Sequence, residues 1–201
     1  MDRRVIALIV ISVLVLVFWP DPAAKYEDLS DGLIPPAALE QPKQQNLSSK
    51  NSFKINKTLI TPLAEFEIAA RVLGVEPYYF DRGASISPVD LALGWGVMAK
   101  PETLAHINIS QRNRWYYWRT ENDNVALRDI QVNSANMHMV PANDLIAKKL
   151  KSVASGQFIN IKGKLIQAEE EGGWRWRSSL TRQDTGGGAC ELIYVEEVTF
   201  L

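Results

Sequence analysis

The sequence predicts an α+β domain: a mostly antiparallel, small barrel-like or sandwiched sheet with a few short helices, preceded by one N-terminal transmembrane helix. Three observations lead to this class: an apolar run at the N-terminus, a polar segment behind it, and short strand-like segments divided by Gly and Pro. With 201 residues, of which 46% are hydrophobic and 22% charged, the chain has room for one globular domain plus appendages. A net charge of -1 argues against a nucleic-acid partner, because such domains are usually basic.

The apolar run covers residues 5–19 and follows Arg3 and Arg4. As a helix it would span roughly 22 Å, which is short of the ~30 Å hydrocarbon core of a bilayer. The flanking arginines favour a cytoplasmic N-terminus and a translocated remainder. A cleaved signal peptide is disfavoured by Pro22 near the cleavage site, and a buried core helix is the third alternative. We therefore expect an uncleaved signal anchor over residues 1–20.

Behind the anchor, residues 21–60 are rich in Pro, Gln, Asn, Ser, Lys and Asp. Such a segment buries too little apolar surface to offset the entropy of ordering it. The sequence therefore predicts a flexible tether over residues 21–60 and a single extracytoplasmic domain over residues 61–201.

The first elements of the domain are predicted from alternation and from capping residues. Apolar residues alternate over residues 66–73, which indicates a strand. Ser87 and Pro88 are typical of the N-cap and first position of a helix. A short helix is expected there, ended by Gly94 or Gly96.

One clear helix and several strands complete the predicted domain. Pro141 opens an amphipathic segment with lysines in its last turns, and Gly156 ends it. Gly172 and Gly173 are expected to join two strands as a hairpin. The other predicted elements are a short turn from Pro101 to His106 and strands at residues 114–120, 134–140, 158–168, 174–180 and 190–200.

The triplet that begins at Asp184 (Asp-Thr-Gly) matches that of aspartic proteases. Those enzymes place it after a hydrophobic strand and need a second aspartate to share a proton. Here the polar segment LTRQ precedes it, so a glycine-rich loop is the better interpretation.

The single cysteine, Cys190, could be a nucleophile with His138 or His106 as base, oriented by Asp90 or Asp184. Glycines just before it could supply an oxyanion site. Against this, Cys190 opens an apolar strand, where a free cysteine is often a small buried hydrophobe. The histidines and cysteine show none of the compact spacings of zinc sites. Neither a metal nor a cofactor is therefore predicted.

Arginine and aromatic residues alternate on two strand-like segments, where they could form cation–π contacts across neighbouring strands. The functional interpretation is a face that binds an anionic or aromatic ligand, a glycan, a peptide or single-stranded nucleic acid. The structural alternative is a sheet with aromatic packing inside and solvated arginines outside. The candidate ligand- or partner-binding residues are Arg114, Trp115, Trp118, Arg119, Trp174, Arg175, Trp176 and Arg177.

Three long phrases, FDRGASISPVDLALGWG, NSANMHMVPA and WRWRSSLTRQDTGGGACE, resemble those of an uncharacterised family of bacterial membrane-anchored proteins. The resemblance covers roughly residues 66–195. It implies a bacterial origin and supports an inner-membrane address. With the flanking arginines, this predicts a single-pass protein whose N-terminus is cytoplasmic and whose C-terminal domain is periplasmic or extracellular. The resemblance carries no reaction, ligand or site residues.

These observations together predict a non-catalytic, membrane-anchored domain that binds a protein partner or ligand in the bacterial envelope. One alternative is a small thiol-dependent hydrolase that uses Cys190 and His138. Another is a structural subunit of a larger envelope complex.

Overall fold

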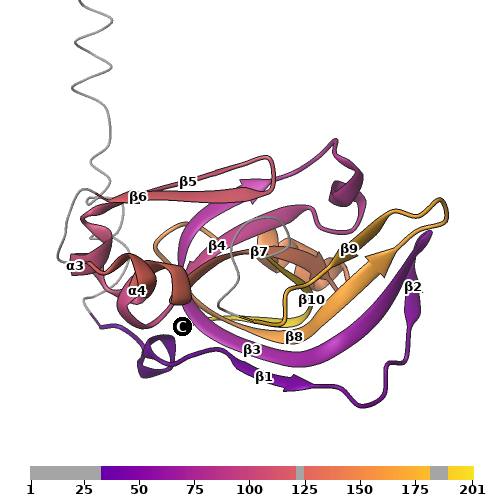
Figure 1. Ribbon diagram of the computed structural model, residues 1–201, viewed down its shortest axis with the longest axis horizontal. Coiled ribbons are helices and arrows are strands. Elements are labelled where there is room, and N and C mark those ends of the chain that lie inside the picture. The colour runs from indigo at the N-terminus through magenta and orange to yellow at the C-terminus, as the bar shows by residue number, and fades with distance from the viewer. Residues whose placement is uncertain (1–32, 121–124, 182–189) are drawn as a thin grey trace, which may run out of the picture.

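The computed structural model describes residues 33–120, 125–181 and 190–201, which form a mixed α+β fold with a mostly antiparallel sheet and a few short helices (Figure 1). This coarse fold class is the predicted one. The expected anchor at residues 1–20 and the first part of the expected tether lie outside the described residues. Within the described part, no helix is long and apolar enough to cross a membrane.

The described elements follow one another in a fixed order along the chain. They are η1 (Pro36–Leu39), β1 (Lys43–Asn46), β2 (Phe53–Ile55), β3 (Thr58–Pro77), η2 (Arg82–Ser85), β4 (Val89–Gly94), η3 (Gly96–Ala99), α3 (Pro101–Leu104), β5 (Ile107–Arg112), β6 (Trp115–Thr120), α4 (Leu127–Val132), β7 (Ser134–Pro141), α5 (Asp144–Lys151), β8 (Phe158–Glu169), β9 (Arg175–Arg177) and β10 (Glu191–Phe200).

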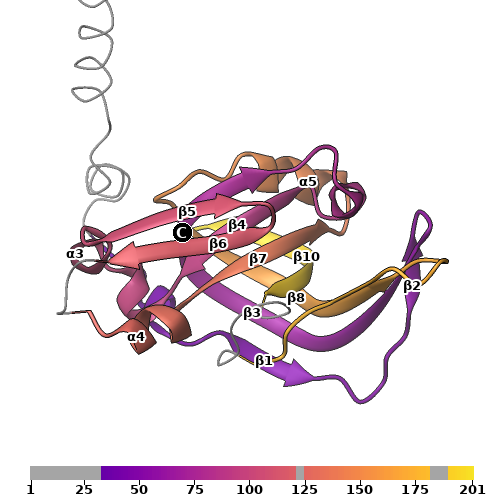
Figure 2. The ribbon, with the colours of Figure 1, turned by 45° about the horizontal axis from the view of Figure 1, so that its top comes forward.

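Five of these strands pair in a ring. The 20-residue strand β3 pairs with β8 through its first part and with β4 through its last part. β4 pairs antiparallel with β7, β7 parallel with β10, and β10 antiparallel with β8. The pairings β3–β4–β7–β10–β8–β3 therefore close on themselves, and Figures 1 and 2 show the sheet curling accordingly.

Irregular positions allow the strands to bend around the ring. The registers shift within β3 between Pro62 and Ala64, and within β10 between Val195 and Glu197, and such bulges bend a strand. Opposite the second bulge, Gly163 leaves no room for a side chain, because a Cβ there would collide with the carbonyl of Tyr194. A glycine is therefore required at this position of β8.

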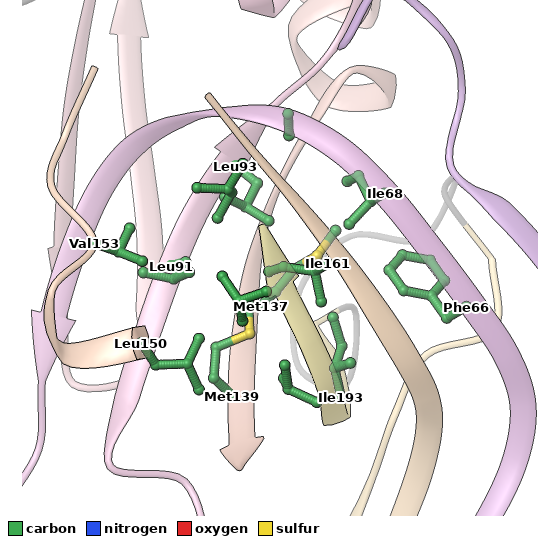
Figure 3. Close-up of a cluster of buried hydrophobic side chains, with 14 of the residues drawn as sticks. Phe66, Ile68, Leu91, Leu93, Met137, Met139, Leu150, Val153, Ile161 and Ile193 are labelled. Carbon is green, nitrogen blue, oxygen red and sulfur yellow. The ribbon is translucent and has the colours of Figure 1, made fainter. Parts of the chain in front are cut away.

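The interior of the ring holds the main hydrophobic core (Figure 3). On β8, Ile159, Ile161 and Leu165 are fully buried, as the alternation of the sequence predicts. Leu150 and Val153 come from α5 and the residues just after it, so the helix covers one side of this core. Each fully buried aliphatic side chain stabilises the fold by about 1.5–3 kcal/mol. The labelled core residues of the strands are Phe66, Ile68, Leu91, Leu93, Met137, Met139, Ile161 and Ile193.

The prediction of a short helix after Ser87 and Pro88 is wrong, because residues 89–94 form the central strand β4. All six of its residues are buried, so the apolar–polar alternation of an ordinary strand is missing. One face packs inside the ring, and the other packs through Ala92 on a second core formed by Leu73, Met98, Leu104, Ile107 and Ile130.

The predicted helix after Pro141 is present but begins later, as α5. Pro141 ends β7, and the side chain of Asn143 caps the helix by accepting a hydrogen bond from the Ile146 amide at 3.1 Å. The hairpin predicted at Gly172 and Gly173 is also present, with both glycines at positive φ between β8 and β9.

Residues 33–60 differ from the expected flexible tether, since they form η1, β1, β2 and the start of β3. β1 pairs with residues 64–67 of β3. It lies on the same edge of β3 as β4, which pairs only with residues 71–77. Gln41 accepts a hydrogen bond from the indole of Trp95 at 3.0 Å. The strand β1 is exposed and polar because backbone hydrogen bonds, rather than apolar burial, hold it. Composition alone does not reveal such a strand.

Candidate binding cleft

A cavity of about 980 Å³ opens on one side of the ring. It is lined by residues 78–83 between β3 and β4, residues 113–115 at the tip of the β5–β6 hairpin, and residues 174–177 at β9, together with His138 and Cys190. We call this site the aromatic cleft. The hairpin tip, η2 and β9 lie on the same side of the ring in Figure 1, although they are far apart in the sequence.

Arg114 connects the walls of the cleft. Its guanidinium donates to both carboxylate oxygens of Asp81, at 3.0 and 3.1 Å, and to Oδ1 of Asp90 at 2.7 Å. The same guanidinium lies 3.6 Å from the centre of the Tyr78 ring and 5.5 Å from that of Trp176. One side chain thus joins the β3–β4 loop, the buried floor of β4 and the aromatic wall.

The hairpin turn places Arg114 at this point. Asn113 and Arg114 both have positive φ, which is the backbone of a two-residue hairpin turn. A positive φ is unusual for arginine and costs about 1–2 kcal/mol. The amide of Arg114 donates to the Tyr78 hydroxyl at 2.7 Å. This hydrogen bond and the side-chain contacts of Arg114 offset the cost of the positive φ.

The carboxylate of Asp90 is the buried end of this network. Its side chain is 1% exposed and accepts from Arg114 through Oδ1 and from Asn136 through Oδ2 at 3.2 Å. Asn136 in turn accepts from Gln111 at 2.7 Å and donates to the carbonyl of Arg114. The negative charge of Asp90 is therefore balanced and hydrogen-bonded, as a buried carboxylate requires.

Asp81 is the exposed end of the network, with 39% of its side chain accessible. Burial of this carboxyl opposes its ionisation, but the hydrogen bonds and charge of Arg114 outweigh that effect. The pKa of Asp81 therefore lies below its ordinary value.

His138 lies on β7 below the cleft, with its side chain 3% exposed. Its Nδ1 is 2.9 Å from Oδ2 of Asp90, and no hydrogen bond joins the two atoms. The imidazole packs against the indole of Trp176, with ring centres 4.6 Å apart. The tryptophan thus covers the histidine.

The β3–β4 loop also contacts the hairpin between β8 and β9. Arg82 pairs with Glu170 at 3.0 Å and lies 5.2 Å from the centre of the Trp174 ring. Gly83 allows Trp176 to approach, since a Cβ on Gly83 would stand 2.7 Å from the indole. The rim beyond these contacts is apolar and exposed: Tyr79 is 74% and Phe80 100% accessible.

The structure gathers six of the eight predicted ligand- or partner-binding residues at the cleft. The two others lie elsewhere: Trp118 packs on the second core, and Arg119 is exposed on β6 without lining the cavity. The six that line the cleft are Arg114, Trp115, Trp174, Arg175, Trp176 and Arg177.

The candidate catalytic residues fall in different places. Cys190 and His138 both line the cleft, whereas His106 is at the opposite end of the six-residue strand β5, about 20 Å from the hairpin tip. Asp184 lies outside the described residues. In the part of the chain that the structure describes, no group of three or more His, Cys, Asp or Glu side chains could hold a metal ion.

Residues 78–82, which supply the rim and the partner of Arg114, were not among the predicted binding residues. The signal was present as an aromatic and charged run, YYFDR, directly after a strand. Such residues between two buried strands are typical of a binding loop.

Comparison of the chain with protein-family models, with curated proteins and with solved structures found no match. What the cleft can do is therefore inferred from its own residues.

Proposed function

We propose that the chain is a membrane-anchored extracytoplasmic domain that binds a protein partner or ligand of the bacterial envelope in the aromatic cleft. One observation carries the proposal: three separate segments bring three tryptophans, two tyrosines, a phenylalanine and four arginines around a single cavity. Its volume, about 980 Å³, is in the range of ligand sites. Apolar rings as exposed as Tyr79 and Phe80 are typical of interaction surfaces.

The cleft is held in shape before any ligand arrives. Arg114 ties the hairpin tip to Asp81 and Asp90, and Arg82 ties the β3–β4 loop to Glu170. A site that is already ordered loses less entropy on binding, so more of the contact energy contributes to affinity.

The ring itself supports a binding role by analogy. We interpret it as a small closed barrel whose strand order resembles the five-stranded Greek-key barrel known as the OB fold. Such barrels bind ligands with the face of their second and third strands and with the loops after the first and fourth strands. Here those elements are β4, β7, the loop after β3 and the loop after β8. Residues 78–83, His138 of β7 and residues 174–177 line the cleft, and β4 supplies Asp90, which pairs with Arg114. A shared fold does not fix the ligand, so this is support at the level of architecture.

The proposed location rests on the sequence. The apolar run with two arginines before it favours a single-pass inner-membrane anchor with a cytoplasmic N-terminus. The cleft would then face the periplasm or the exterior of the cell.

Co-purification in mild detergent tests this function. We compare the wild-type full chain with Phe80→Ala/Trp115→Ala, which trims two exposed rings at the cleft, and with Leu145→Ala, which trims an exposed side chain on α5. A protein, glycan or small molecule that accompanies the wild type and Leu145→Ala, but not the cleft variant, supports the proposal. Equal recovery with all three proteins, or nothing in any of them, contradicts it.

A thiol-dependent hydrolase is the second candidate, because Cys190 and His138 line the same cleft and Asp90 touches the imidazole. The indole that covers His138 weighs against it. Iodoacetamide labelling distinguishes the two. If Cys190 in the wild type is alkylated several-fold faster at neutral pH than in His138→Gln, the imidazole activates the thiol. Equal rates contradict the hydrolase.

A further inference from the structure

We propose that the occupant of the aromatic cleft is an extended polypeptide segment that pairs with the free edge of β9 and places acidic side chains beside Arg175 and Arg177. This inference rests on the proposed function of the cleft and names the class of its partner. It follows from three observations: the direction of the β9 backbone, the path of the cavity, and the charges on one face of the strand.

The backbone of β9 has one satisfied side and one open side. Trp174 accepts from the Glu170 amide at 3.0 Å, and the Ser178 amide donates to Ile166 at 2.9 Å, both toward β8. Because the direction alternates along an antiparallel strand, the N–H and C=O groups of Arg175 and Arg177 point away from β8. In the described part of the chain β9 pairs with no second strand, so this edge is open to an added one.

The cavity runs along this edge. Neighbouring residues of a strand face opposite sides of the sheet, yet four consecutive residues, 174–177, all line the cleft. A cavity that reaches both faces of a strand must pass its edge. An extended segment lying in the cleft is therefore within reach of the outward backbone groups.

The two faces of β9 differ in chemistry. Trp176 lies against His138 and Trp174 on one face, which makes that wall aromatic. On the other face, Arg175 and Arg177 both donate to a single neutral acceptor, Oε1 of Gln167. Two guanidinium groups thus converge on an amide oxygen.

The charges around this pair leave an excess of positive charge. Arg175 is 3.6 Å from Glu169, whereas the side-chain contact of Arg177 among the described residues is with Gln167. A carboxylate beside the two arginines would balance this excess charge. Arginine is well suited to this, because its guanidinium can donate two parallel hydrogen bonds to a carboxylate.

A strand alternates its side chains, so the expected partner alternates too. Acidic residues would point toward Arg175 and Arg177, and apolar or aromatic residues toward Trp176. Nucleic acids and glycans lack a peptide backbone to pair with the edge. The charges around the other cleft arginines also cancel: Arg114 pairs with Asp81 and Asp90, and Glu170 pairs with both Arg82 and Lys57. This balance disfavours a row of phosphates.

A displayed library of random peptides, each about ten residues long and so able to form one strand, tests this with the full chain in mild detergent. We expect the enriched peptides to alternate acidic and apolar residues. N-methylation of alternate backbone amides in an enriched peptide should abolish binding, because it removes the donors that pair with β9. A library that enriches no peptide, or peptides without acidic residues, or binding that survives methylation in both registers, would overturn the proposal.

Two variants examine the arginines directly. Arg175→Gln/Arg177→Gln should weaken binding of an enriched peptide by about tenfold to a hundredfold, while Lys148→Gln/Lys151→Gln, which removes two charges from exposed positions on α5, should leave it unchanged. Arg175→Glu/Arg177→Glu should instead enrich peptides with lysine or arginine, which a misfolded protein would not do. The role of these arginines would be refuted if Arg175→Gln/Arg177→Gln bound the peptide with unchanged affinity and Arg175→Glu/Arg177→Glu still enriched acidic peptides.

The outcome is separable from that of the proposed function. If the Phe80→Ala/Trp115→Ala variant loses a co-purifying glycan or nucleic acid while the library enriches no acidic peptide, the cleft is a binding site but its partner is not a polypeptide strand. If neither experiment depends on the cleft, both proposals fail.

Discussion

Replacement of Arg114 by alanine is the perturbation whose cost the structure predicts best. The variant removes two hydrogen bonds to Asp81, the hydrogen bond to Asp90 and the stacking on Tyr78. The Asp81 pair is partly exposed, so its loss costs only about 0–1 kcal/mol. The Asp90 carboxylate is 1% exposed, and removing the partner of a buried charge costs about 3–5 kcal/mol. We therefore expect Arg114→Ala to lower the free energy of unfolding by about 3–5 kcal/mol.

Two companion variants separate the causes. Arg114→Gly also loses the side chain but relieves the positive φ, so it should be about 1 kcal/mol less destabilised than Arg114→Ala. In Arg114→Ala/Asp90→Asn the orphaned charge is absent, so the double variant should be more stable than the sum of the single effects by about 1–3 kcal/mol. Arg128→Ala, at an exposed position on α4, serves as the control and should stay within about 0.5 kcal/mol of the wild type.

The assay is urea unfolding of the full chain in mild detergent, followed by tryptophan fluorescence. The midpoint should fall while the slope stays constant, because the same surface is exposed on unfolding. A loss below about 1 kcal/mol for Arg114→Ala, or strict additivity with Asp90→Asn, would refute the view that Arg114 neutralises a buried carboxylate.

Three further predictions concern close packing and pH. Gly83→Ala should displace the indole of Trp176, cost about 1–3 kcal/mol and red-shift its emission; an unchanged spectrum and midpoint would contradict the close approach. Because the folded-state pKa of Asp81 lies below its ordinary value, this carboxylate stabilises the fold above about pH 4 and loses that contribution as the pH falls through its folded-state pKa. Asp81→Asn should therefore show a smaller loss of urea midpoint on acidification than the wild type, and parallel losses would count against the pairing. Gly163→Ala should strongly destabilise the ring, since its methyl group meets the carbonyl of Tyr194, and a wild-type midpoint would show that β8 and β10 are farther apart.

The sequence was most informative where local chemistry determines structure. The sequence predicted β6 closely from its aromatic residues, and β8 from the alternation of buried Ile159, Ile161 and Leu165 with Lys162 and Lys164. The sequence also predicted strands close to β7 and β10, although most residues of β7 are buried. It failed at β4, where both faces are buried and a serine–proline pair imitates a helix start. It also failed at β1, where pairing to an open side of β3 depends on tertiary structure rather than on composition.

The candidate site was predictable in part. The arginine–aromatic alternation identified Trp115, Trp174 and Trp176, and it also singled out Trp118, which the hairpin turns toward the second core. The contribution of the β3–β4 loop, including Asp81, depends on a contact between residues far apart in the sequence. No local pattern carries that information, because ring closure brings these segments together.

Site-specific photocrosslinking in living cells tests the central claim, that the aromatic cleft is a binding site, most directly. A photoreactive phenylalanine analogue is placed at Phe80, which is fully exposed on the cleft rim, and separately at Leu145 on α5 as the control. We expect a discrete adduct from position 80 and none from position 145. If the partner is an acidic strand, the adduct at position 80 should be lost when the probe is combined with Arg175→Gln/Arg177→Gln. Irradiation that yields no adduct at position 80, or the same adducts at both positions, would contradict the claim.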